Sequence, residues 1–141
     1  MRLNRLRAAT LLLVGSAYFI DLFLPWIHER GESASGWDVP VISTNGSVVL
    51  ALVLVEAARA RDVWRTRTSA LLGFFLAAGA ALLGVAGLVH MRWGSFFFHA
   101  NFSDFAYGAW ISLALAFALL AGAVIRLTEL ERATNTRGRT A

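Results

Sequence analysis

The sequence predicts an all-α integral membrane protein, a four-helix bundle built from two helical hairpins. Hydrophobic residues make up 57% and charged residues only 16% of its 141 residues, whereas soluble domains are usually about 45–50% apolar and about 25% charged. The apolar residues gather in four long segments, and the arginines gather on one side of these segments. We therefore expect a single transmembrane domain over residues 1–141.

Four segments are long and apolar enough to cross a bilayer, which takes about 20 residues. They cover residues 8–27, 41–58, 71–91 and 105–127. The second segment is the least apolar because residues 43–47 are polar or glycine, and residues 128–141 are predicted to form a flexible basic tail. Each segment is expected to be helical, since backbone groups in lipid must be hydrogen-bonded internally. A water-soluble bundle of very apolar helices is the alternative.

Arginine supplies every basic residue apart from the histidines, and its distribution predicts the orientation of the helices. Eleven of the thirteen arginines flank one side of the bundle, and the other two are Arg30 and Arg92. The positive-inside rule places the eleven arginines, and therefore both termini, in the cytoplasm. We expect a multi-pass plasma-membrane protein in contact with membrane lipids. Such arginines also explain the formal charge of +4, and no nucleic-acid partner is expected because no basic surface is interleaved with aromatic residues.

The chain has no cysteine, which excludes disulfides, a thiolate nucleophile and covalent c-type haem. Arg2, Arg5 and Arg7 before the first apolar segment are typical of a signal peptide. However, the apolar stretch is longer than a signal peptide requires, and no A-x-A-like site follows it directly. An uncleaved first helix is the better interpretation.

The connection between the third and fourth segments, residues 92–105, contains five phenylalanines. Phe98, Phe102 and Phe105 are spaced to share one helical face, and with Trp110 they form the candidate interface. We expect this connection to lie in the membrane interface or to fold over the bundle. It then serves either as a plain anchor or as a contact surface for a second copy or another membrane protein.

Asp21 lies inside the first apolar segment, where a carboxylate is costly and is a functional candidate by default. It is the candidate ion or proton site. Its structural alternatives are a protonated carboxyl or an ion pair with Arg92, Arg30 or His90. Glu56, near the cytoplasmic end of the second segment, is interpreted as an interfacial residue.

The three histidines, His28, His90 and His99, fall on the outer side of the predicted membrane. Histidine binds zinc, copper or b-type haem, so these residues are the metal candidates. Their spacing matches no metal-binding motif, and we therefore expect no cofactor.

Small residues recur four apart in the third and fourth segments, at Gly73, Ala77 and Ala81 and at Ala114, Ala118 and Gly122. Such stripes let helix backbones approach closely in lipid. The pattern does not distinguish packing within one chain from packing between chains.

Three short strings, Phe23 to Trp26 (FLPW), Ser35 to Asp38 (SGWD) and Tyr107 to Trp110 (YGAW), resemble those of small actinobacterial four-helix membrane proteins of unknown function. The resemblance implies two helical hairpins, the first leaving the membrane at the FLPW turn and the second re-entering at the GAW segment. It implies no activity.

Three classes of function stay open. The first is a non-enzymatic membrane protein, without catalytic residues, that assembles with itself or with a larger membrane complex. The second is a small oligomeric transporter or channel that uses Asp21. The third is a haem or metal redox protein that uses the outer histidines.

Overall fold

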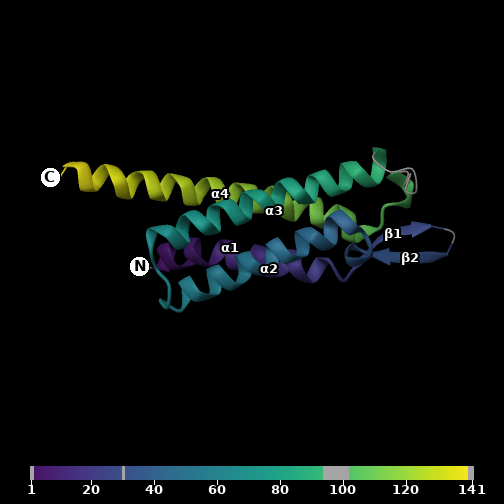
Figure 1. Ribbon diagram of the computed structural model, residues 1–141, viewed down its shortest axis with the longest axis horizontal. Helices are drawn as coiled ribbons and strands as arrows, with labels where there is room; N and C mark the ends of the chain where they lie inside the picture. Colours follow the sequence, from purple (N-terminus) through teal and green to yellow (C-terminus); the bar gives the residue numbers. More distant parts are fainter. Residues whose placement is uncertain (1, 30, 94–101, 140–141) are drawn as a thin grey trace.

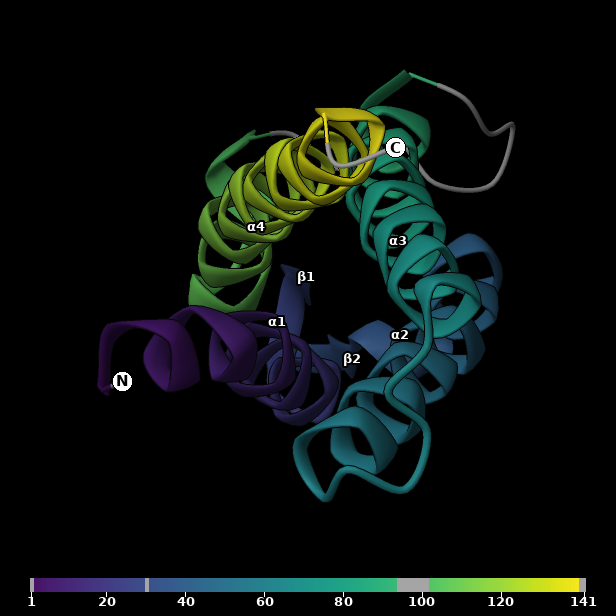
Figure 2. The same ribbon diagram turned by 90° about the vertical axis from the view of Figure 1, so that its left-hand side faces the viewer.

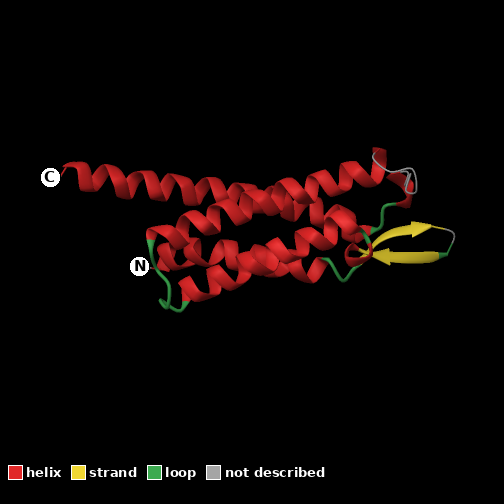
Figure 3. Cartoon of the chain, viewed as in Figure 1, coloured by secondary structure: helices red, strands yellow, loops and turns green. Residues whose placement is uncertain are grey.

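The computed structural model describes residues 2–29, 31–93 and 102–139. Four helices account for most of this chain (Figure 3): α1 (Arg2–Asp21), α2 (Pro40–Ala60), α3 (Arg67–Trp93) and α4 (Tyr107–Arg139). Two short strands, β1 (Pro25–Glu29) and β2 (Glu32–Ser35), and a 3-10 turn, η1 (Gly36–Asp38), connect α1 to α2. A second 3-10 turn, η2 (Phe102–Asp104), precedes α4.

The helices run up and down in a ring, in the order α1, α2, α3, α4 (Figure 2). Each helix packs against its neighbours in the ring, and α4 closes the ring against α1, whereas α1 and α3 face each other across the diagonal with little contact. Both termini and the α2–α3 turn lie at one end, which we call the inner end (Figure 1). The two strands project from the opposite, outer end.

Small residues of α3 and α4 contribute to the centre of the bundle, beside large buried side chains such as Tyr18, Leu52 and Leu119. Gly73, Ala77, Ala81 and Gly84 of α3 are buried, and a Cβ atom at Gly122 of α4 would lie 2.6 Å from the side chain of Leu11 on α1. Most of the small-residue positions therefore serve packing within one chain, which the sequence pattern alone leaves undecided.

Large apolar side chains point outward on every helix. The exposed ones include Leu13 and Ile20 of α1, Leu54 of α2, Phe75 and Leu82 of α3, and Phe117 and Val124 of α4. Within the described residues, three stretches are long and apolar enough to cross a membrane, Val41–Ala60, Arg67–Arg92 and Tyr107–Arg132, and only 33%, 33% and 39% of them is buried. The apolar part of α1, Ala9–Asp21, is shorter, so three predicted spans meet the requirement and the first does not.

The all-α prediction is confirmed for the four helices and wrong for the outer end. The first helix is predicted over 8–27, but α1 ends at Asp21, and β1 and β2 pair as an antiparallel hairpin. Pro25 explains the early end, because proline lacks the amide hydrogen that a helix needs and disfavours helical geometry in the residue before it. Gly31, with a φ of 87°, supplies the left-handed residue of the turn between the strands.

The remaining helices are close to their predicted ranges and longer at some ends. The second and third helices extend the predicted 41–58 and 71–91 by one to four residues at each end. The segment 128–141, predicted as a flexible tail, continues α4 as helix as far as Arg139.

Candidate functional site

The outer end of the bundle is closed by the strands and η1, which we call the outer cap. Trp26 of β1 is fully buried, and its indole nitrogen donates a hydrogen bond of 3.0 Å to the backbone oxygen of Asp21. Two glycines make room for the ring, since a Cβ atom would lie 3.0 Å from it at Gly36 and 2.8 Å from it at Gly108. Trp37 packs against Gly46 in the same way, since a Cβ atom at Gly46 would lie 2.6 Å from its ring. Two tryptophans of the cap therefore pack closely against glycines of the cap and of the helices.

The cap also connects the two helical hairpins. Ile27 of β1 forms a β-bridge with Phe105, and the amide of Ala106 donates a hydrogen bond of 2.8 Å to the carbonyl oxygen of Trp26. Strand β1 therefore lies between β2 on one side and the segment before α4 on the other.

Asp21 is the last residue of α1, and Trp26 binds its backbone oxygen. Its exposed fraction is 2%, and neither carboxyl oxygen has a hydrogen-bond partner among the described residues. The alternative pairing with Arg92 or His90 is therefore absent from the described structure, and Arg30 lies outside the described residues. Asp21 is a buried carboxyl group with no partner in the described part of the chain.

Three further buried polar side chains lie in the outer half of the bundle and, with Asp21, form what we call the outer polar cluster. Asn45 of α2 donates hydrogen bonds to the hydroxyl of Tyr18, at 3.3 Å, and to the carbonyl oxygen of Ala80, at 3.0 Å. Ser112 of α4 donates to the carbonyl oxygen of Ala109 at 3.0 Å. The Oδ1 atom of Asn45 has no partner in the described structure.

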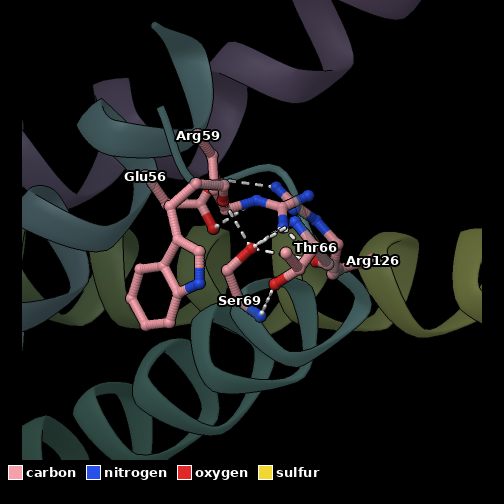
Figure 4. Close-up of polar contacts among 6 residues, drawn as sticks. Glu56, Arg59, Thr66, Ser69 and Arg126 are labelled. Carbon is pink, nitrogen blue, oxygen red and sulfur yellow. Dashed lines mark hydrogen bonds and ion pairs between the residues drawn. The ribbon is translucent and has the colours of Figure 1, made fainter. Parts of the chain in front are cut away.

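A second group of polar side chains, the inner polar cluster, lies at the inner end (Figure 4). Glu56 of α2 is 1% exposed and Arg126 of α4 is 5% exposed, and the Arg126 Nη2 atom donates to the Glu56 Oε2 atom at 2.8 Å. The Arg59 Nε atom lies 3.8 Å from the Glu56 Oε1 atom. The sequence predicts Glu56 as an interfacial residue; it lies near the inner end, and a salt bridge to the fourth helix buries it between the helices.

The inner polar cluster extends into the α2–α3 turn. Arg59 Nη1 donates to the Ser69 hydroxyl at 2.6 Å and to the Thr66 carbonyl oxygen at 3.1 Å. Thr66 and Ser69 exchange reciprocal backbone-to-side-chain hydrogen bonds of 3.1 Å, which satisfy free amide groups at the start of α3. A Cβ atom at Gly73 would collide with the Glu56 carboxylate. The Glu56 carboxylate of α2 therefore contacts α4 through Arg126 and α3 at Gly73, and Arg59 connects it to the α2–α3 turn.

The candidate metal residues do not come together in the described part of the chain. His28 of β1 and His90 of α3 are both exposed, and His99 lies outside the described residues. Among the residues that were searched, no three histidine, aspartate or glutamate side chains form a metal-binding group.

The candidate interface is described in part. Phe98 lies outside the described residues, and Phe102 begins η2. The rings of Phe105 and Trp110 lie 6.1 Å apart, and Trp110 is 49% exposed. Both residues border an apolar groove between α3 and α4, which is also lined by Val85, Leu88, Val89, Arg92, Ala109 and Leu113.

Sequence reasoning missed Asn45, Tyr18 and the Glu56–Arg126 pair as members of buried clusters. The available signal was their position inside apolar segments, where polar and charged groups usually face a partner. In the sequence, Arg126 is one of the eleven arginines whose distribution predicts the orientation. No protein-family model, curated protein or solved structure matches this chain.

Proposed function

We propose that the protein is a non-enzymatic multi-pass protein of the plasma membrane that acts by assembling with itself or with a larger membrane complex. The observation that carries this proposal is the division of side chains within the bundle. Its interior is packed with small residues and with large side chains such as Tyr18, Leu52 and Leu119, and further large apolar residues are exposed to the outside on all four helices. Exposed apolar area on this scale is unfavourable in water but matches a lipid environment.

The arginines at the inner end support the proposed orientation of the four helices, although the apolar part of α1, Ala9–Asp21, is shorter than the other three apolar stretches. The first turns of α1 carry Arg2, Arg5 and Arg7 at the inner end. The α2–α3 turn and the last turns of α4 add arginines at that end, which supports a cytoplasmic inner end.

The outer part of α3 and α4 is the proposed assembly face. Tyr107 and Trp110 are 54% and 49% exposed, and the groove bordered by Phe105 lies beside them. Aromatic residues of this kind are enriched in protein interfaces. Most of the small-residue stripe positions are buried within the chain, so this aromatic face is the better candidate for contact between chains.

Cysteine labelling tests the orientation, because the chain has no cysteine of its own. Ser33 in the hairpin and Thr68 at the start of α3 are both exposed. In intact cells, a membrane-impermeant maleimide should label Ser33→Cys and should label Thr68→Cys only after the cells are opened. The reverse pattern would overturn the proposed orientation, and removal of the protein from membranes by alkaline carbonate would overturn membrane insertion.

Native mass spectrometry in mild detergent tests the assembly. Complexes larger than one chain are expected for the wild type and should be reduced in Trp110→Ala. Phe117→Ala is the matched control, because Phe117 is a 62% exposed aromatic residue of the same helix outside the groove. A wild type that is monomeric both in detergent and after cross-linking in native membranes would refute assembly.

A further inference from the structure

The outer polar cluster contains more hydrogen-bond acceptors than donors. Both carboxyl oxygens of Asp21 and the Oδ1 atom of Asn45 lack partners in the described structure. The donors of the cluster are engaged elsewhere: the amide group of Asn45 with Tyr18 and Ala80, and the hydroxyl of Ser112 with a backbone carbonyl. The indole of Trp26 donates to the backbone oxygen of Asp21 and is thus not available to its carboxyl group.

The charged groups of the described residues do not compensate for this shortage. No arginine or histidine of the described residues forms an ion pair with Asp21; the salt bridges found there involve Glu56 and Asp62. The titratable side chain nearest in sequence on the same face is Tyr18, one turn earlier on α1, with one hydroxyl proton to share among several acceptors. From α2 and α4 the cluster receives Asn45 and Ser112, which carry no charge. A bare carboxylate is strongly disfavoured in such surroundings.

We propose that Asp21 is a proton-binding site, a neutral carboxylic acid held between the outer end of the bundle and the outer cap. The bound proton removes the charge and turns one oxygen into a donor, which corrects the shortage of donors. A hard metal cation is the poorer ligand, because such ions take six or more oxygen atoms, and only three side-chain oxygens of the outer polar cluster lack partners in the described structure.

The outer cap controls exchange of this proton. Trp26 is fully buried, and its hydrogen bond to the Asp21 carbonyl oxygen fixes the ring over the end of α1. Water therefore reaches the carboxyl group when the cap opens locally, and the exchange rate reports the stability of the cap. This inference stands whether or not the protein assembles with partners.

Infrared spectroscopy of the full chain in phospholipid nanodiscs tests the proposal. At neutral pH, the wild type should show the carbonyl stretch of a protonated carboxylic acid, and Asp21→Asn should lack it. Asp38→Asn, which alters an exposed carboxylate, should retain the band. Labelling the aspartates with ¹³C in the wild type assigns the same band without a substitution, so a folding failure of Asp21→Asn does not affect the result.

Transfer into D₂O tests the role of the cap. The band should shift slowly in the wild type and about fivefold faster in Trp26→Phe, the factor expected for loss of one hydrogen bond. A wild type without the band at neutral pH, or a band insensitive to aspartate labelling, would overturn the proton site. A carboxylate band that shifts on addition of sodium would assign the site to a metal cation instead. Equal exchange rates in the two proteins would refute control by the cap.

Discussion

Glu56 and Asp21 are both buried carboxyl groups, at opposite ends of the same bundle, and they differ in their partners. Glu56 is bound by Arg126 at 2.8 Å and approached by Arg59 at 3.8 Å, whereas Asp21 has no partner among the described residues. Burial alone therefore does not define the role of a carboxyl group. The inner one is part of a salt bridge between α2 and α4, and the outer one has the surroundings of a neutral acid.

Removing the partner of Glu56 should give the largest effect. Arg126→Met leaves a buried carboxylate poorly compensated and should lower the free energy of unfolding by about 3–5 kcal/mol. Denaturant titration in detergent micelles measures the change. The control is Arg65→Met, which breaks an exposed ion pair with Asp62 and should cost at most about 1 kcal/mol. Equal losses in the two variants would show that the inner salt bridge does not stabilise the bundle.

Glycine substitutions compare the packing of the two clusters. A Cβ atom at Gly73 would collide with the Glu56 carboxylate, and one at Gly84 with the Tyr18 hydroxyl. Gly73→Ala and Gly84→Ala should each destabilise the protein by about 1–3 kcal/mol, the usual cost of overpacking. Gly79→Ala is the matched control on the same helix, since nothing lies within 4 Å of its Cβ position.

Gly79→Ala should leave the stability unchanged or raise it by up to about 1 kcal/mol, because alanine favours the helix. The midpoints of thermal unfolding of Gly73→Ala, Gly84→Ala and Gly79→Ala, compared with that of the wild type, measure these changes. If Gly79→Ala were as harmful as the other two, the loss would reflect helix α3 in general and not its polar contacts.

Apolar replacement of the two carboxyl groups sharpens the comparison further. Asp21→Leu should stay within about 1 kcal/mol of the wild type or be more stable, because it removes an unsatisfied polar group. Glu56→Leu should be clearly less stable, because it leaves Arg126 buried without its carboxylate. The free energies of unfolding of both variants are measured in the same lipid mixture. A larger loss in Asp21→Leu than in Glu56→Leu would contradict this expectation.

The smallest expected effect on stability is that of the Asp38 carboxylate, and this effect depends on pH. The amide and hydroxyl of Ser35 donate to Asp38 Oδ2 at 2.7 and 2.8 Å, and these bonds hold the pKa of the Asp38 carboxyl below its ordinary value. A lowered pKa means that the contribution to stability is fully present above the ordinary pKa of about 3.9. This contribution is lost as the pH falls through the lower native value.

The fluorescence of the tryptophans, among them the neighbouring Trp37, can follow this acid titration of the cap. Asp38→Asn should remove the acid step while leaving the signal at neutral pH close to that of the wild type. An unchanged acid step in Asp38→Asn would assign it to another group.

The helices were predictable because their signal is local. Long apolar runs predict α2 and α3 to within a few residues of their observed ends. Such runs predict helix because backbone groups in a bilayer must be hydrogen-bonded within the segment. The outer hairpin was not predicted, since its strands have only five and four residues and follow an apolar run without a break in hydropathy. Pro25 carries the relevant signal, because proline ends helices, but the apolar run continues past it to residue 27.

The candidate site was predictable only in part. Asp21 stands out in the sequence as a lone carboxylate in an apolar run. Glu56 and Arg126 are seventy positions apart, and each one alone resembles an interfacial charge. Their pairing depends on the ring order of the helices, which composition and spacing do not encode.

The position of β1 between two partners has a consequence for biogenesis. Until residues 105 and 106 arrive, one edge of β1 has unpaired backbone groups, and its pairing with Phe105 and Ala106 connects parts of the chain made far apart in time. The first helical hairpin can therefore form as it leaves the ribosome, but its sheet edge stays open. Formation of the second hairpin closes that edge, so the completed cap marks a fully folded chain.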